Sequence, residues 1–125
     1  MSEQKKGDLT IRVLAMPADT NPSGDVFGGW LLSQMDIAGG VFCRKIAKGR
    51  VVTVAIASTT FKLPVFVGDT LCCYVHLIKK GRTSITVGIE AWVNREFGEE
   101  GSSIKVTEGQ YTYVKVDENR NPIPI

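Results

Sequence analysis

The sequence predicts an α+β fold in which an antiparallel β-sheet wraps around one long central helix. The segment from Gly28 to Lys48 carries apolar side chains nearly all round its helical axis, a pattern typical of a buried helix. Segments rich in Val, Ile and Thr follow it and are joined by short turns, which favours antiparallel strands. We expect the sheet to wrap this helix because no other segment combines helical length with such an apolar surface.

The expected elements follow one another in a simple order. Alternating apolar residues predict a first strand, and Pro17 ends it. Residues 18–25 are rich in Asp, Asn, Pro, Ser and Gly and predict a loop before the helix. Four strands are expected after the helix, the first with at least one buried face, and a charged loop is expected from Arg95 to Ser103. The five expected strands are Leu9 to Leu14, Val51 to Lys62, Thr70 to Lys79, Thr83 to Asn94 and Ile104 to Val116.

The composition limits the classes of protein. A chain of 125 residues predicts one domain, residues 1–125. A net charge of +2 is too small to indicate binding of nucleic acid or a membrane surface. No apolar run approaches the roughly 20 residues that a membrane-spanning helix needs. The polar stretch from Met1 to Asp8 does not look like a signal peptide, and we therefore expect a cytoplasmic location.

One acidic residue lies in the middle of the apolar helix. Asp36 is flanked by Met35 and Ile37, and a carboxylate in such surroundings is costly unless it is paired or used. It is either a structural acid, satisfied by backbone donors or by a threonine, or a chemically active group. Gly39 and Gly40 follow it at a cost of roughly 1 kcal/mol each relative to alanine. Close approach of another backbone is the expected reason, and simple tolerance of the two glycines is the alternative.

Several runs of residues, spread over essentially the whole chain, form a joint pattern. They are Ala15-Met16-Pro17, Asn21, Gly24 to Asp36, Gly49 to Val54, Val67-Gly68-Asp69, Cys72-Cys73-Tyr74, Glu90 to Val93 and Tyr113 to Asp117. This pattern resembles the hotdog-fold acyl-CoA thioesterases of the YciA type. The resemblance implies a hotdog fold, hydrolysis of acyl-CoA to a free acid and CoA without a metal or organic cofactor, and Asp36 at the catalytic aspartate position. It also implies homodimers that assemble further into hexamers.

The start of the helix supplies the second half of the expected chemistry. The first N–H groups of a helix lack partners within it and carry partial positive charge. At Gly28 and Gly29 no side chain blocks a thioester carbonyl, whose developing oxyanion these N–H groups suit. Asp36 then acts either as the base that activates water or as a nucleophile.

Helix geometry separates these two groups within one chain. Gly29 and Asp36 lie on similar faces but roughly 10 Å apart along the axis, too far for attack through one water. Two helices antiparallel across a two-fold axis bring the start of one to the middle of the other. We therefore expect a homodimer with two composite active sites.

Two loop residues and one strand end are further candidates. The resemblance places a functional Asn or Asp before the two glycines, which indicates Asp25 and Asn21. Helix capping by Asp25 and an Asx turn at Asn21 are the structural alternatives. Thr59, Thr60 and Phe61 resemble a strand segment beside the thioester, and ordinary strand packing explains them equally well.

A basic turn is the expected CoA-binding segment. It consists of Lys79, Lys80, Gly81, Arg82, Thr83 and Ser84. Its cations suit phosphate groups and its glycine exposes a backbone N–H group, although a solvated hairpin turn has the same composition.

Two other functions remain compatible with the pattern. A dehydratase or hydratase on the same fold commonly pairs a histidine with an acid, but His76 lies outside the motif. A non-catalytic module that binds acyl-CoA is the other. The cysteines show no metal-ligand spacing, so no metal site is expected, and the acyl chain length is unreadable from the sequence.

Overall fold

The computed structural model describes residues 4–95 and 102–125. Its elements are β1 (Asp8–Leu14), the short 3-10 helix η1 (Pro17–Asp19), α1 (Gly28–Ala47), β2 (Val51–Phe61), β3 (Thr70–Lys80), β4 (Ser84–Asn94) and β5 (Ser103–Lys115). Each expected helix and strand is present, with ends within one residue of the expected positions. Of the charged loop expected from Arg95 to Ser103, residues 96–101 lie outside the described part.

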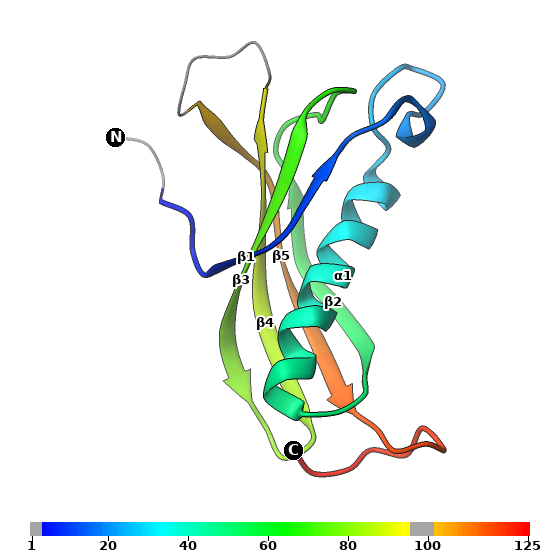
Figure 1. Cartoon of the computed structure of the whole chain (residues 1–125), viewed down its shortest axis with the longest axis vertical. Helices are drawn as coiled ribbons and strands as arrows, with labels where there is room; N and C mark the ends of the chain where they lie inside the picture. The colour runs from blue at the N-terminus through cyan, green and yellow to red at the C-terminus, as the bar shows by residue number, and fades with distance from the viewer. Residues whose placement is uncertain (1–3, 96–101) are drawn as a thin grey trace.

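The strands form one antiparallel sheet in the order β1-β3-β4-β5-β2. Figure 1 shows the sheet twisting strongly, with α1 lying along one of its faces. The expected α+β arrangement is therefore confirmed. In the part of the chain that the structure describes, no helix has the length and apolar character needed to span a membrane.

The helix buries one side against the sheet and leaves the other side open. Met35, Ala38 and Cys43 are fully buried in the core, whereas Ile37 is 51% exposed and Val41 is also exposed. The expectation that α1 is buried on every side is wrong for the single chain, because the sheet covers only one face of the helix. Lys48 closes the helix in the left-handed conformation, with its N–H donating to the carbonyl oxygen of Arg44.

Strand β2 also differs from its expectation. It lies at the edge of the sheet, and none of its residues is buried. Val54, Ile56 and Phe61 are exposed, although their apolar character predicts a buried face. The reason is that β2 has a neighbouring strand on one side only, and the helix contacts just one of its faces, so its other face is uncovered in a single chain.

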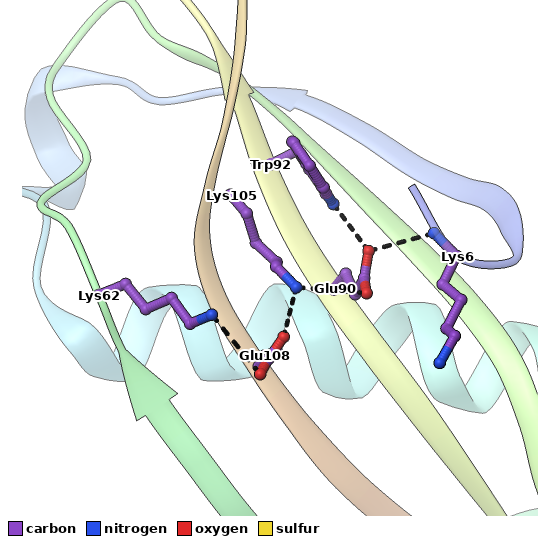
Figure 2. Close-up of polar contacts among 6 residues, drawn as sticks. All are labelled: Lys6, Lys62, Glu90, Trp92, Lys105 and Glu108. Atoms are coloured by element: carbon purple, nitrogen blue, oxygen red, sulfur yellow. Dashed lines mark hydrogen bonds and ion pairs between the residues drawn. The ribbon is translucent and has the colours of Figure 1, made fainter. Parts of the chain in front are cut away.

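The face of the sheet away from α1 carries a charged network around two buried residues, Glu90 and Trp92. Glu90, only 8% exposed, accepts hydrogen bonds from the Trp92 indole N–H (3.0 Å) and the Lys6 backbone N–H (3.1 Å), as Figure 2 shows. Lys105 pairs with Glu90 at 3.5 Å and with Glu108 at 2.6 Å. Because the buried carboxylate is both paired and hydrogen-bonded, we interpret this network as structural.

Candidate active site

A cavity of about 400 Å³ opens at the start of α1. Among the residues that line it are Asn21 and Asp25 from the preceding loop, Gly28 from the helix and Phe61 from the end of β2. The structure thus brings together four of the residues that the sequence nominated, from three separate segments of the chain.

The loop before the helix is shaped by Asn21. Its side-chain Oδ1 accepts hydrogen bonds from the backbone N–H groups of Ser23 (2.9 Å) and Asp25 (3.2 Å). Its own N–H donates to the carbonyl oxygen of Asp25 at 2.7 Å. The Asx turn considered for Asn21 is therefore present. Capping by Asp25 is not, since the helix N-cap is Phe27 and no side chain caps it.

The first amides of α1 are open. The N–H groups of Gly28 and Gly29 have no acceptor among the described residues, and both glycines are exposed. A Cβ atom on Gly28 would lie 3.4 Å from the Phe61 ring, which is ordinary contact. The packing within one chain therefore does not require glycine there. Two unpartnered N–H groups with no side chain in front of them can stabilise an anionic oxygen.

Asp36 lies half-buried at mid-helix and has two hydroxyl partners. The Thr53 hydroxyl donates to its Oδ1 at 2.6 Å. The Tyr113 hydroxyl lies 3.0 Å from the same Oδ1 and 2.8 Å from the backbone carbonyl oxygen of Asp36. A threonine donor was among the structural alternatives for this acid. Tyr113 was not nominated from the sequence, because its contact with Asp36 joins residues 77 positions apart.

Burial, and then the neighbouring Asp36 carboxylate, raise the pKa of Tyr113 well above its ordinary value. Its hydroxyl therefore stays protonated at working pH and acts as a hydrogen-bond donor to Asp36. The only sequence signal for this role is the alternation of Tyr111 and Tyr113 in β5, which places both rings on one face of the sheet.

Within one chain, the oxyanion donors at the helix start lie apart from the Asp36 carboxylate. Gly28 and Asp36 are separated by about 12 Å along the helix axis at about 1.5 Å per residue, and Asp36 does not line the cavity at the helix start. A single chain therefore places the oxyanion donors and the carboxylate in different places, as the sequence-based argument for a composite site requires.

The basic turn between β3 and β4 lies at the other end of the molecule, where α1 ends (Figure 1). Its Gly81 N–H donates to the carbonyl oxygen of Ser84 at 2.7 Å, which closes the turn. The expectation that this N–H group is exposed to a phosphate is therefore wrong in the single chain, because the turn itself uses it. The N–H of Ile125 donates to the carbonyl oxygen of Arg82 at 2.9 Å, so the C-terminal residues brace it. Lys79, Lys80 and Arg82 are exposed, but one chain does not bring them to the cavity.

The three residues of the strand segment Thr59-Thr60-Phe61 lie in different surroundings in the structure. Phe61 lines the cavity, whereas Thr59 and Thr60 do not. A bulge between Ala57 and Thr60, with Ser58 at φ 55°, shifts the register of β2 against β5. The buried Thr59 hydroxyl packs against Gly109, with no hydrogen-bond partner among the described residues.

The only histidine lies on the face of the sheet away from α1 and Asp36. His76 packs over Gly88 on the face of the sheet that carries Glu90 and lines a separate cavity of about 210 Å³ there. Burial raises the pKa of the Cys43 and Cys73 thiols to about 12, which leaves both unreactive. Within the described ranges, no group of three or more His, Cys, Asp or Glu residues is suited to hold a metal ion.

Sequence comparison decides the family. The profile of the Thioesterase superfamily matches residues 23–96, which include the end of the loop, the helix and the first three strands after it. The chain belongs to the thioesterase superfamily. Two similar relatives are each called "Acyl-CoA thioester hydrolase YciA". The one from Salmonella typhimurium is 50% identical over 126 residues, covering 100% of this chain and 95% of its own length. The one from Escherichia coli K12 is 52% identical over 118 residues, covering 94% and 89%.

Solved structures of other superfamily members give the same fold. The hexameric thioesterase y2039 from Yersinia pestis matches with a TM-score of 0.92 and 50% identity, covering 98% of both chains. HI0827, described as a hexameric broad specificity acyl-coenzyme A thioesterase, matches with a TM-score of 0.92 and 48% identity, covering 98% of this chain and 84% of its own. Cj0915 of Campylobacter jejuni, a hexameric hotdog fold thioesterase, matches with a TM-score of 0.88 and 42% identity, covering 95% and 90%. The fold of this thioesterase-superfamily chain is therefore the hotdog fold.

Proposed function

We propose that this protein is an acyl-CoA thioester hydrolase, which converts an acyl-CoA and water to a free acid and CoA. The observation that carries the proposal is Asp36, a carboxylate at mid-helix whose Oδ1 accepts hydrogen bonds from two hydroxyl groups. Its Oδ2 accepts none from the described residues, so one oxygen remains for chemistry. Relatives at about half sequence identity that bear the name of this activity support the assignment.

The reaction needs two groups that one chain keeps apart. Gly28 and Gly29 stabilise the oxyanion that forms as the thioester carbonyl carbon is attacked. Asp36 of a second chain, with its helix antiparallel to the first, either takes a proton from the attacking water or attacks the carbon itself. In the first case the C–S bond breaks, the free acid forms, and the proton held by Asp36 passes to the CoA thiolate. In the second case the C–S bond breaks to leave a mixed anhydride on Asp36; water then hydrolyses the anhydride to the free acid and the Asp36 carboxylate, and the proton released goes to the CoA thiolate. Asp25 and Asn21 line the cavity beside the glycines and act on the same bound group.

A homodimer is the minimal unit that this mechanism requires. The open side of α1 and the edge strand β2 supply exposed apolar residues for the contact, among them Ile37, Val41, Val54 and Ile56. Large exposed apolar patches mark interaction sites in proteins. By analogy with the hexameric relatives, three such dimers form a hexamer.

The substrate's nucleotide end is assigned to the basic turn from Lys79 to Ser84. Lys79, Lys80 and Arg82 offer positive charge to the phosphate groups. The turn lies at the same end of the chain as the C-terminus of α1 (Figure 1). In an antiparallel pair of helices, this end of one chain approaches the helix start of the other. Phe61 then flanks the acyl group at the cavity, whereas Thr59 and Thr60, which do not line it, serve the strand leading to Phe61.

The proposal involves no metal or organic cofactor, no nucleic acid and no membrane, and treats residues 1–125 as one domain. A cytoplasmic location fits it. The three cysteines are free, and two of them are far too weakly acidic to react readily. Reduced thiols are typical of the cytosol.

The test is direct loss of thioester absorbance with a panel of acyl-CoAs, comparing wild type with Asp36→Asn. Asparagine keeps the shape of the side chain and an oxygen for the Thr53 and Tyr113 hydroxyls, so the fold is expected to hold. We expect turnover in the wild type and a loss of 10²-fold or more in kcat in the variant, on the order of a general-base contribution.

Each other outcome has a definite meaning. Retained CoA binding without turnover on any acyl-CoA would contradict the proposal and support a non-catalytic binding module. Full activity in Asp36→Asn would keep the enzyme but overturn the role of Asp36, and Asp25→Asn would be measured next. Hydration of an unsaturated acyl-CoA without thioester loss would support the dehydratase class, which the distance of His76 from Asp36 disfavours.

A further inference from the structure

Two tyrosines on β5 support the helix in parallel ways. The Tyr111 hydroxyl donates to the backbone carbonyl oxygen of Leu32 at 3.2 Å, and the Tyr113 hydroxyl donates to that of Asp36 at 2.8 Å. Their rings are stacked, with centroids 6.5 Å apart and planes 14° from parallel. Both side chains are essentially fully buried. The two tyrosines therefore support the helix in the same way, at Leu32 and at Asp36, which lie four residues apart.

The two tyrosines differ at one point. Only the Tyr113 hydroxyl also reaches a side chain, the Oδ1 of Asp36, at 3.0 Å. Oδ1 also accepts a hydrogen bond from the Thr53 hydroxyl, and Thr53 on β2 is the cross-strand partner of Tyr113 on β5. The single Tyr113 hydroxyl proton is shared between the Asp36 carbonyl oxygen and Oδ1, and together with the Thr53 donor it fixes the rotation of the carboxylate. Oδ2 is left as the oxygen without a partner among the described residues.

The chain makes room for this hydroxyl at a specific position. A Cβ atom on Gly39 would collide with the Tyr113 hydroxyl and would lie 2.8 Å from its ring atom Cε1. The expected close approach at Gly39 is real, but the neighbour is a side chain rather than a backbone. At Gly40 the nearest atom to a Cβ would be 3.9 Å away, so only the first glycine is required by packing.

We propose that Tyr113 is a positioning residue for the reaction assigned to this protein: it holds the Asp36 carboxylate so that Oδ2 faces the substrate. The inference rests on the proposed thioesterase function. Tyr113 acts through Asp36, because it is buried beneath the helix and lines neither the cavity at the helix start nor the basic turn. Its hydroxyl stays protonated, so it supplies a hydrogen bond and takes no part in proton transfer.

The experiment compares Tyr113→Phe with Tyr111→Phe. Both variants keep the ring and remove one buried hydroxyl that binds a helix carbonyl, so a general loss of stability affects both. We expect Tyr113→Phe to lower kcat by about 3- to 10-fold, the usual range for one hydrogen bond, with KM unchanged within about two-fold. We expect Tyr111→Phe to keep kcat within about two-fold of the wild type. Circular dichroism and Tm check that both variants fold.

A second measurement does not depend on turnover. With aspartate selectively labelled with ¹³C, we expect the carboxyl resonance of Asp36 to differ from wild type in Tyr113→Phe and to be unchanged in Tyr111→Phe. If the wild type hydrolyses no acyl-CoA, the proposed function fails and this resonance still decides the contact. Equal kcat in the two variants, or an unchanged resonance in Tyr113→Phe, would overturn the positioning role.

Discussion

The hydroxyl oxygen of Thr53 lies 2.6 Å from Oδ1 of Asp36, a short hydrogen bond that ties the edge strand β2 to the middle of helix α1. Hydrogen bonds to an ionised group are shorter and stronger than those between neutral groups. This bond therefore fixes the only acidic side chain of the helix against a strand that is otherwise exposed.

The first prediction concerns this bond. We expect Thr53→Val to lower kcat by about 5- to 10-fold, because a bond of about 1 kcal/mol to the reacting carboxylate is lost. Thr53→Ser keeps the hydroxyl, and we expect it to stay within about two-fold of wild type. Steady-state kinetics on one acyl-CoA measures both. Equal losses in the valine and serine variants would assign the effect to the methyl group and contradict the prediction.

The second prediction compares two neighbouring glycines. Gly39→Ala forces a methyl group against the Tyr113 hydroxyl, and we expect it to lower the free energy of unfolding by about 1–3 kcal/mol. Gly40→Ala meets no atom closer than 3.9 Å, and we expect a gain of up to about 1 kcal/mol from helix propensity. Urea unfolding gives both values. Similar shifts of the same sign would show that packing on Tyr113 does not distinguish the two positions.

The third prediction concerns assembly through the β2 edge. Ile56 on β2 and Leu9 on β1 are 46% and 47% exposed, so they form a matched pair on opposite edges of the sheet. We expect Ile56→Asp to yield inactive monomers and Leu9→Asp to remain at least dimeric, as measured by light scattering after size-exclusion chromatography. Dissociation by Leu9→Asp alone would place the dimer contact on the β1 edge instead.

The fourth prediction concerns acid stability. A hydrogen bond from Lys105 is the main cause that lowers the pKa of Glu108 below its ordinary value of 4.5. A lowered folded-state pKa stabilises the protein above about pH 4.5, and this contribution disappears as the pH falls through the lowered value. We therefore expect Glu108→Gln to lower Tm at pH 6 and to have a smaller effect at pH 3.

Salt provides the control for this pH effect. The Glu108 side chain is 40% exposed, so its ion pairs with Lys105 and Lys62 are partly screened by water and contribute modestly. We expect the Tm difference at pH 6 to shrink at high salt, because exposed charges interact over shorter distances there. A Tm difference that is the same at pH 3 and pH 6 would mean that the charge of Glu108 is not its cause.

The local pattern of the sequence determined the order of α1 and the five strands and placed their ends to within one residue, although it did not predict η1. Hydrophobic periodicity, Gly and Pro act between residues close in the chain, so the helix, the strand that ends before Pro17 and the two strands that flank Gly81 were predictable. The same local chemistry identified Asp36 as a carboxylate in an apolar helix. It also identified Gly28 and Gly29 as amides without side chains.

Tertiary structure alone decided which distant groups meet. The contacts of Asp36 with Thr53 and Tyr113 join segments 17 and 77 positions apart, and they depend on strand order and register rather than on local pattern. The same is true of the Phe61 ring at the helix start and the exposed face of β2. A sequence pattern shows whether a residue needs an apolar contact or a hydrogen-bond partner. Only the packing of the sheet on the helix determines which partner satisfies it.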